Sequence, residues 1–342
     1  MNASKLRVSL LGLGRAGSFH LQSLRLLPGV ELTAVYDVDR EKTQHVADEF
    51  ECRAAADPAG AIDQPDVDAI IVATPTDSHY QFVELGLRSS KAVFTEKPLG
   101  SSLREIDDSF ALANEKGLAL FVAFQRRFDP SFGALIESAQ NGDLGQVQFV
   151  RSVSRDNPVP STDYIRISGG IFHDCMVHDL DMVLQIVGEK PTHLSSFGSS
   201  YLPEIGELGD FDNVVATLAF PSGAAASIDI SRKGVFGYDQ RLEVFGDEGM
   251  IQAENQHGTS LTRADAAGFR RDPIDVSFPT RYRDAYVAEL ACFCRCVRGD
   301  EPVPITYADV RTNHLLASGL ELAARERRVV TFDEIESATE GS

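Results

Sequence analysis

The chain has 342 residues, of which 43% are hydrophobic and 24% are charged. This length and composition are ordinary for a globular protein and leave room for two domains, each with its own core. The formal net charge of −19 at pH 7 argues against nucleic acid, whose phosphates require Lys and Arg, and against an anionic membrane surface as a partner. No run approaches about 18 consecutive apolar residues, so we expect no membrane span.

The first residues and a group of three cysteines bear on where the protein is located and on whether it binds a metal. Residues 1–8 lead at once into a strand, and we expect no signal peptide there. Cys292, Cys294 and Cys296 alternate within an amphipathic stretch, and side chains two positions apart on a helix point away from each other. Zinc sites usually use cysteine pairs separated by two residues. We therefore predict buried small side chains, no metal, and a reducing, cytoplasmic location.

The first recognisable motif follows directly on a short apolar stretch. Residues 6–11 are apolar enough for a strand, residues 12–17 read Gly-Leu-Gly-Arg-Ala-Gly, and residues from about 18 to 27 are typical of a helix. A strand, the pattern G-x-G-x-x-G and a helix in this order predict a dinucleotide-binding turn at the start of a Rossmann fold.

Each residue of this turn has an expected role. Gly12 allows the tight turn, Gly14 lets a pyrophosphate approach the backbone, and Gly17 lets helix and strand pack closely. The N-terminus of the helix offers N–H groups that have no partner within the helix, and Arg15 and Ala16 of the turn belong to the same expected cofactor site. We expect these groups to bind the phosphates of the cofactor.

An acidic residue at the end of the second predicted strand indicates which cofactor binds. The strand at 31–37 ends in Asp37, twenty residues after Gly17. A carboxylate at this place accepts hydrogen bonds from the ribose hydroxyls and repels a 2′-phosphate, which favours NAD over NADP. Arg40 lies nearby and could soften that preference. The alternative is that Asp37 caps the next helix, which begins at 39–42.

Three more apolar stretches predict strands of the same sheet, at 66–73, 91–95 and 118–124. The carboxyl ends of such strands face the ligand in an open α/β sheet. The loop after the first of them holds Thr74, Pro75 and His79, which we place in the cofactor site. His79 is expected to open the following helix rather than to transfer protons.

Glu96, Lys97 and Pro98 stand at the carboxyl end of the strand at 91–95. Pro98 lacks an N–H donor and disfavours helical geometry at the residue before it. We expect Glu96 and Lys97 to lie in the cofactor site, with the lysine close to the nicotinamide. The alternative is an ordinary exposed lysine at a strand end.

The stretch 169–188 is predicted to be one helix with glycines at both ends. Asp174, His178, Asp181 and Gln185 fall on a narrow stripe opposite a broad apolar face. The stretch has no Lys, Arg or Glu, so the stripe resembles the wall of a pocket more than a solvated face. Asp174 and His178 are four residues apart, and a carboxylate beside an imidazole suits a proton-transfer base. The alternative is a polar surface stripe.

Five segments together resemble the glucose-fructose oxidoreductase/inositol dehydrogenase (Gfo/Idh/MocA) family. They are residues 12–17, 73–79, 96–99, 126–130 and 169–181. The resemblance runs from about residue 6 to about 246. It implies an α/β protein with an N-terminal Rossmann domain, a doubly wound parallel sheet, at about 1–125. A C-terminal α/β domain with a large open, mostly antiparallel sheet would take 126–342.

The later sequence supports such a sheet independently, because several stretches read as strands separated by turn signals. These stretches are 146–154, 193–200, 213–220, 224–231 and 240–245. Two amphipathic helices are predicted at about 281–298 and 307–326, and a terminal strand at 327–331. One face of the sheet would be free, and in similar proteins that face builds a homodimer or homotetramer.

The resemblance also implies a catalytic triad of Lys97, Asp174 and His178. In this hypothesis His178 takes the hydroxyl proton while hydride leaves the same carbon for the nicotinamide. Asp174 orients substrate and imidazole, and Lys97 stabilises the developing alkoxide. In similar enzymes the lysine and histidine can share the proton transfer, and the sequence does not separate them.

Three further residues are implied to bind the substrate. Arg127 and Asp156 correspond to an arginine and an aspartate that similar proteins present to substrate hydroxyls, although Asn157 replaces the family's proline. Tyr238 lies in a segment that resembles one whose tyrosine meets the polyol. The alternative for Tyr238 is an aromatic side chain packed on the sheet.

The predicted activity is NAD-dependent oxidation of a secondary alcohol of a cyclic polyol or sugar, with myo-inositol to its 2-keto form as the first choice. Another sugar substrate, or a nucleotide-sensing protein without turnover, is the alternative. A metal site made from His173, Asp174, Cys175 and His178 competes for the same helix. His173 and His178 are five apart, which on a regular helix does not favour one shared ion.

Overall fold

The computed structural model describes residues 5–340, so the residues at which we expect no signal peptide lie partly outside it. The chain forms two compact units. The first holds the chain up to Phe128 together with Arg283–Arg311, and the second holds Asp129–Tyr282 and the chain from Thr312 on. A single division near residue 125 misses the return of Arg283–Arg311. That return is driven by Phe293, whose ring packs against aromatic rings of the first unit.

The first unit is built on a six-stranded sheet with the order β3-β2-β1-β4-β5-β6, and all of its strands are parallel. This is the strand order of a Rossmann domain and confirms the predicted fold class. The strands are β1 Leu6–Leu11, β2 Val30–Tyr36, β3 Arg53–Ala54, β4 Ala69–Val72, β5 Ala92–Thr95 and β6 Leu120–Val122. The short β3 was not expected.

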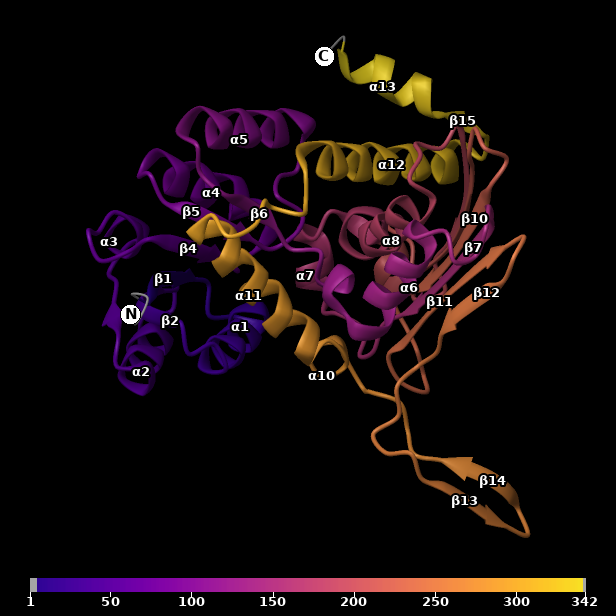
Figure 1. Cartoon of the computed structure of the whole chain (residues 1–342), viewed down its shortest axis with the longest axis horizontal. Coiled ribbons are helices and arrows are strands. Elements are labelled where there is room, and N and C mark those ends of the chain that lie inside the picture. The colour runs from indigo at the N-terminus through magenta and orange to yellow at the C-terminus, as the bar shows by residue number, and fades with distance from the viewer. Residues whose placement is uncertain (1–4, 341–342) are drawn as a thin grey trace. The chain divides into compact units, whose positions relative to one another are not determined.

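Helices cover both faces of this sheet (Figure 1). They are α1 Arg15–Arg25, α2 Arg40–Phe50, α3 Pro58–Ile62, α4 His79–Arg88, α5 Leu103–Lys116 and α11 Arg283–Arg298, with short turns η1 Thr76–Ser78 and η2 Gln125–Phe128. Local sequence explains the ends of α5, since Ser102 and Glu105 form a capping box and Gly117 ends the helix in a left-handed conformation. Helix α1 begins earlier than predicted, directly after Gly14.

The second unit contains a seven-stranded sheet with the order β12-β11-β7-β10-β9-β8-β15. Only β7 and β10 pair in parallel, so the predicted mostly antiparallel sheet is confirmed. Its strands are β7 Val147–Arg155, β8 His193–Ser199, β9 Asn213–Ala219, β10 Ala225–Ser231, β11 Asp239–Gly246, β12 Met250–Ala253 and β15 Val330–Thr331. A separate hairpin, β13 Thr262–Asp265 with β14 Gly268–Arg271, projects from this unit (Figure 1).

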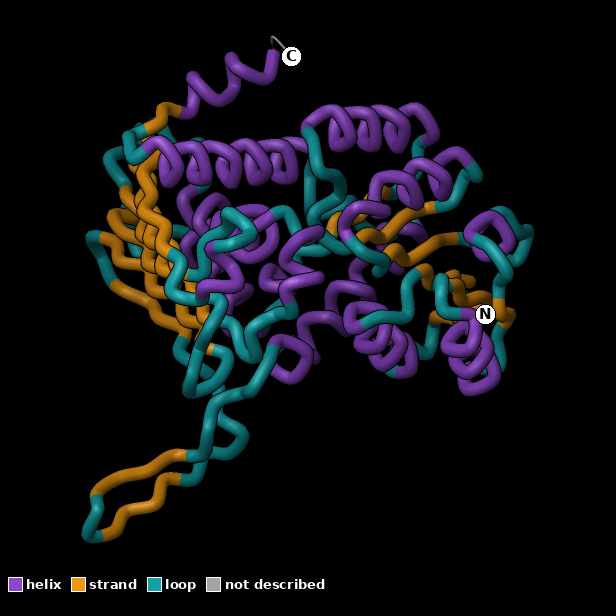
Figure 2. The backbone as a smooth tube through the Cα atoms, turned by 180° about the vertical axis from the view of Figure 1, so that it is seen from behind, coloured by secondary structure: helices purple, strands orange, loops and turns teal. Residues whose placement is uncertain are grey.

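The helices of the second unit gather on one face of the sheet, and the other face has none among residues 5–340 (Figures 1 and 2). They are α6 Pro130–Gln140, α7 Thr162–Ile167, η3 Phe172–Met176, α8 Val177–Val187, α9 Pro203–Gly206, α10 Phe278–Arg281 and α13 Phe332–Glu340, with α12 Tyr307–Glu326 starting in the first unit. Strand β9 alternates buried and exposed residues, as expected for a sheet with one covered face. None of the helices in residues 5–340 has the length and hydropathy that crossing a bilayer requires.

Candidate active site

The glycine turn has the geometry that a dinucleotide requires. Gly12 has φ +90°, and a Cβ there would lie 2.5 Å from the carbonyl oxygen of Ala73. A Cβ at Gly17 would lie 2.0 Å from the carbonyl oxygen of Gly12, so helix α1 and strand β1 pack too closely for any side chain. At Gly14 a Cβ would meet no atom of the chain within 4 Å. Packing therefore explains two of the glycines, whereas at Gly14 the space beside the backbone is open.

Asp37 braces this turn from the end of β2. Its Oδ2 accepts a hydrogen bond from the backbone N–H of Leu13 at 2.6 Å, and its Oδ1 accepts one from that of Asp39 at 2.9 Å. The cap of α2 is Asp39, whose side chain accepts the N–H of Lys42 at 3.0 Å. The alternative of Asp37 as the helix cap is therefore wrong. Arg40 is exposed in the first turn of α2.

The loop after β4 is held together by its own side chains. The Ser78 hydroxyl lies 2.8 Å from Thr74 Oγ1 and 2.7 Å from the Pro75 carbonyl oxygen, within hydrogen-bond distance of both. His79 begins α4, as predicted, and is almost fully buried. Its Nε2 lies 2.8 Å from the Thr74 carbonyl and its Nδ1 lies 2.7 Å from that of Pro98. Burial lowers the pKa of His79 despite these two carbonyl contacts.

The Glu96 carboxylate, at the end of β5, contacts a residue that the sequence did not single out. Its Oε1 lies 2.7 Å from Nε2 of His20, a fully buried residue of α1. Burial alone would raise the pKa of Glu96, but the His20 contact and the charges of Lys97 and His79 bring that pKa below its ordinary value. The signal available in the sequence was a histidine three residues after Gly17, on the buried side of α1. Lys97 itself is half-buried.

The stretch predicted as one regular helix contains a π turn. The chain is helical from residue 170 to 187, and Gly188 ends the helix in a left-handed conformation as predicted. Phe172–Met176, however, form a π turn rather than an α turn. Such turns are rare and are frequent at functional sites. The assumption of a uniform 3.6-residue period is therefore wrong in the half of the helix that carries Asp174.

Asp174 is the centre of a buried network. The Tyr164 hydroxyl donates to its Oδ1 at 2.8 Å, and the Arg232 guanidinium donates to its Oδ2 at 3.0 Å. Arg232 is fully buried and also donates to Asp210 Oδ2 at 3.3 Å. Asp210 in turn accepts the backbone N–H of Ile171 at 3.1 Å. The network thus fixes both the Asp174 carboxylate and the start of its helix.

The pKa values of both side chains that bind Asp174 are raised. Burial and the neighbouring Asp174 carboxylate raise the pKa of Tyr164. Burial alone would lower the pKa of Arg232, but the neighbouring Cys175, Asp174 and Asp210 raise it overall. A protonated phenol and a charged guanidinium therefore face the carboxylate. Neither Tyr164 nor Arg232 was predicted, because nothing local in the sequence indicates that either meets Asp174.

Asp156 lies next to this network. The thiol of Cys175 is 3.4 Å from Asp156 Oδ2 and 3.8 Å from Asp174 Oδ2. The backbone of Asp156 continues the pairing of β7 with β10, through an N–H donated to the Ser231 carbonyl at 2.8 Å. The second unit thus brings together Asp156 and Asp174, two of the residues predicted from sequence.

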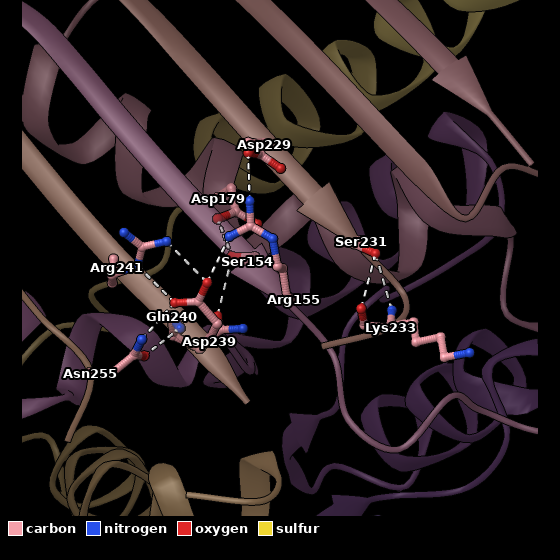
Figure 3. A network of polar contacts seen from close by, with 10 residues as sticks. All are labelled: Ser154, Arg155, Asp179, Asp229, Ser231, Lys233, Asp239, Gln240, Arg241 and Asn255. Atoms are coloured by element: carbon pink, nitrogen blue, oxygen red, sulfur yellow. Dashed lines mark hydrogen bonds and ion pairs between the residues drawn. The ribbon is translucent and has the colours of Figure 1, made fainter. Parts of the chain in front are cut away.

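The strand ends that carry this region are fixed by a polar network (Figure 3). Arg155 donates to Asp239 at 2.6 Å and to Asp229 at 2.7 Å, which ties β7 to β11 and β10. Asp239 is fully buried and also accepts from Arg241 at 2.7 Å and from Asn255. Burial would raise the pKa of Asp239, but these hydrogen bonds lower it. Asp156 and the other residues next to this network therefore lie at strand ends that the network holds rigid.

The other residues of the predicted polar stripe differ in how far they are buried. His178 is half-buried near the start of α8, and its Nδ1 is buried. Asp181 is buried rather than facing an open wall. Asp179, which we did not place on the stripe, is fully buried and accepts hydrogen bonds from Ser152 and Ser154, both at 2.6 Å. Part of the polarity of this helix therefore serves packing on β7.

Two of the predicted substrate residues have structural contacts of their own. Arg127 donates to the Pro304 carbonyl at 3.0 Å and lies 3.5 Å from the Asp309 carboxylate. Tyr238 is 6% exposed, and its ring lies edge-on to that of Tyr282, with centroids 5.9 Å apart. For Tyr238 these contacts favour the packed aromatic alternative. For Arg127 they favour a role in fixing the segment before α12.

The donors of the competing metal site do not converge. The His173 ring lies 4.7 Å from that of His314 on α12, whereas Asp174 faces Tyr164 and Arg232. Within residues 5–340 one set of three donors lies within 4.8 Å, namely Cys292, Cys296 and Glu301.

That second set is not prepared for a metal ion. Cys292, Cys294 and Cys296 of α11 are buried, as predicted. The sulfur atoms of Cys292 and Cys296 lie 4.0 Å apart. Burial and the Glu301 carboxylate raise the pKa of the Cys292 thiol, which disfavours the thiolate that binds metals. Glu301 already pairs with Arg295 at 3.0 Å.

Comparisons with known proteins agree with this geometry. Residues 6–124 match an oxidoreductase family with an NAD-binding Rossmann fold, and residues 132–252 match the Gfo/Idh/MocA C-terminal domain. The chain is 37% identical to a myo-inositol 2-dehydrogenase of Thermotoga maritima over 332 residues, which cover 96% of this chain and 99% of the relative. It is 34% identical to a scyllo-inositol 2-dehydrogenase (NAD(+)) of Bacillus subtilis, over 90% of this chain and 91% of the relative.

A solved structure is similarly close. The crystal structure of a probable dehydrogenase from Thermotoga maritima superimposes with a TM-score of 0.94 at 37% sequence identity. The match covers 96% of this chain and 100% of the other. The similarity therefore extends over both units.

Proposed function

The chain belongs to the Gfo/Idh/MocA oxidoreductase family, and from this premise we propose that it oxidises a secondary hydroxyl of a cyclic polyol, with myo-inositol as the first candidate. It is an NAD-dependent oxidoreductase that acts on CH–OH groups. The observation that carries the choice of substrate is its similarity, over nearly the whole chain, to relatives named as inositol dehydrogenases.

The residues of the glycine turn fit the cofactor. Gly14 leaves room at the backbone, the first N–H groups of α1 (Arg15 and Ala16) supply phosphate donors, and Asp37 offers carboxylate oxygens to the ribose. Thr74, Pro75, His79, Glu96 and Lys97 complete the proposed cofactor set. When bound, NAD supplies the acceptor for the hydride that leaves the carbinol carbon.

The chemical step requires a base, an orienting group and a cation. We assign the base to His178, which takes the hydroxyl proton as the carbon–oxygen single bond becomes a carbonyl. Asp174 orients the substrate, and Tyr164 and Arg232 support this role by holding its carboxylate in one position. The ammonium of Lys97 stabilises the negative charge that develops on oxygen.

A polyol needs several polar contacts, and the second unit offers them close together. Asp156 and Asp174 both lie within 4 Å of the Cys175 thiol. Carboxylates accept hydrogen bonds from hydroxyl groups, and such paired contacts reject analogues that lack a hydroxyl. Asp156 is therefore the best supported substrate residue, whereas Arg127 and Tyr238 would act more through their packing. A scyllo configuration is the second candidate, and another sugar derivative is the third.

The test is formation of NADH by the purified chain with myo-inositol, scyllo-inositol and a small sugar panel. We expect turnover of at least one inositol. Binding of NAD without turnover of any panel member would contradict the proposed function and favour a nucleotide sensor.

The residue roles are tested by His178→Ala and Lys97→Met. Each is expected to lower kcat by about 100-fold or more, since positioned acid–base and electrostatic groups contribute that much. The exposed residues His193 and Lys116 provide matched controls, His193→Ala and Lys116→Met. Activity within tenfold of the parent would remove the altered residue from the chemical step.

We also propose the setting in which the enzyme works. The uncovered face of the seven-stranded sheet carries exposed Phe149, Phe197, Val215 and Phe245, which supports a homodimer or homotetramer formed through this face. The net charge of −19 supports the absence of nucleic acid and membrane partners. Five free cysteines support a reducing, cytoplasmic location.

A further inference from the structure

Two buried histidines contact the residues on either side of Lys97 in the chain. Glu96 precedes it and contacts His20 of α1, with 2.7 Å between Oε1 and Nε2. Pro98 follows it, and its carbonyl lies 2.7 Å from Nδ1 of His79. His20 has no role in the function proposed above, and His79 enters it only as a member of the cofactor set.

We propose that His20 and His79 are positioning residues for Lys97, which they hold from both sides, His20 through Glu96 and His79 through Pro98. This inference rests on the proposed function in one respect, since it takes Lys97 to be in the catalytic set. The geometry that carries it lies entirely within the first unit.

The contribution of the His20–Glu96 contact to the stability of the fold does not explain why a polar pair stands here. His20 is fully buried, and its ring lies between those of Phe19, Phe94 and Tyr286, with centroids 4.7, 5.3 and 6.1 Å away. An apolar residue of similar volume would suit such surroundings better, because a buried polar pair often contributes less than well-packed hydrophobic residues. The pair is therefore better explained by what it does to the backbone at the end of β5.

The surroundings also assign the protonation state of His20. Its Nδ1 is buried and has no hydrogen-bond partner. A proton there would be an unsatisfied buried donor, so the neutral ring with the proton on Nε2 is favoured. The Nε2–H then donates to the Glu96 carboxylate, which stays ionised. An anion is thus held next to the Lys97 ammonium in the chain, and the titratable groups that face this anion are His20, Lys97 and His79.

His79 makes the complementary connection. Its two ring nitrogens contact the carbonyls of Thr74 and Pro98. The imidazole thereby lies between the loop after β4 and the loop after β5, at the edge where a Rossmann fold binds its ligand, and the Nδ1–H tautomer donates to the Pro98 carbonyl. Lys97 lies between the two connections, so its backbone is restrained on both sides.

The experiment compares two substitutions of His20 in the full chain. His20→Phe keeps the ring volume and removes the donor, whereas His20→Gln keeps an N–H donor for Glu96. We expect His20→Phe to lower kcat by about 10- to 100-fold, the scale of a small displacement of a reacting group, with the KM for the polyol changed less than threefold. His20→Gln should recover most of kcat. His45→Gln, an exposed histidine of α2, is the control.

The double variant His20→Phe with Glu96→Gln distinguishes a purely structural role of the His20–Glu96 pair from a role in positioning Lys97. It removes the carboxylate that His20→Phe leaves without its histidine partner and should restore the melting temperature without restoring kcat. The alkaline limb of the kcat/KM pH profile should move to lower pH in both variants that lack the anion, Glu96→Gln and the double variant. Recovery of kcat together with the melting temperature, or equal kcat in His20→Phe and His20→Gln, would overturn the proposal.

A readout that needs no turnover distinguishes this inference from the proposed function. Reductive methylation with ¹³C-formaldehyde labels lysines, and the Lys97→Met variant identifies the resonance of Lys97. We expect that resonance to move in His20→Phe and to stay near its parent position in His20→Gln. An unchanged resonance in His20→Phe would overturn the positioning role even if the parent proves inactive on every polyol, which by itself would contradict only the proposed function.

Discussion

At the scale of single residues, the three glycines of the cofactor turn have different reasons for being glycine. Gly12 has a positive φ and sits against the Ala73 carbonyl, and Gly17 sits against the carbonyl of Gly12. Gly14 touches no atom of the chain at the Cβ position. The fold therefore needs the first two, whereas Gly14 has no packing reason, and the proposed phosphate contact is the role left for it.

This difference predicts opposite outcomes for two alanine substitutions. Gly14→Ala should leave the melting temperature within about 2 °C of the parent, because the added methyl group meets nothing, and should weaken NAD binding about tenfold or more. Gly17→Ala should lower the melting temperature, because its Cβ would collide with backbone. Thermal unfolding and NAD titration by fluorescence measure both effects. A normal Kd for Gly14→Ala would contradict the assigned cofactor contact.

At the scale of elements, the helix from 170 to 187 is held within its π turn by residues from elsewhere in the chain. Asp174 meets Arg232, and His173 packs on His314 of α12, while the Ser318 hydroxyl lies 3.4 Å from His173 Nε2. Burial and the neighbouring His173 lower the pKa of His314 to about 3. Burial also lowers the pKa of His173, against the opposing charge of Glu321.

The two histidines predict a pH dependence of stability. Unfolded histidine has a pKa near 6.5, so as the pH falls below that value the unfolded chain takes up protons that the folded chain does not. The stability present above pH 6.5 is thus lost progressively toward pH 3, at up to about 1.4 kcal/mol per pH unit for each such group. Urea unfolding of the parent and of His314→Gln between pH 7 and 4 measures this.

The expected result is a shallower slope in His314→Gln than in the parent. His193 is exposed on β8, so His193→Gln should keep the slope of the parent. Equal slopes in the parent and His314→Gln would show that this imidazole is not held neutral by its surroundings.

At the scale of the whole molecule, the uncovered face of the seven-stranded sheet is the feature that bears on assembly. Phe197 and Val215 are direct neighbours on β8 and β9, and Phe149 and Phe245 are neighbours on β7 and β11. All four are exposed in the single chain. Pairs of exposed large apolar side chains on an uncovered sheet face are typical of a protein interface.

We predict that Phe197→Glu dissociates the oligomer. A charge placed in the middle of a buried apolar interface costs several kcal/mol, whereas the same change at an exposed position of the free subunit is nearly neutral. Light scattering coupled to size exclusion should show a dimer or tetramer for the parent and a smaller species for the variant. Leu26→Glu, at an exposed apolar position outside this sheet, should behave as the parent. A monomeric parent would contradict the proposed assembly.

The sequence by itself determined the features that depend on short spacings. Strand periodicity, the glycine turn followed by a helix, and the alternating pattern of the later strands are local, and the order of the elements and of the strands in the sheets confirms them. The two-unit division was predicted only in part, since nothing local in Arg283–Arg311 says that this segment returns to the first unit.

The tertiary structure alone decided which polar side chains meet. Arg232 is 58 residues from Asp174 in the chain, and Glu96 is 76 residues from His20. The partner of a buried charge depends on which distant segments become neighbours, and a sequence pattern of period two or 3.6 carries no information on that. For the same reason the packing of Tyr238 and the π turn around Asp174 appeared only in the folded chain.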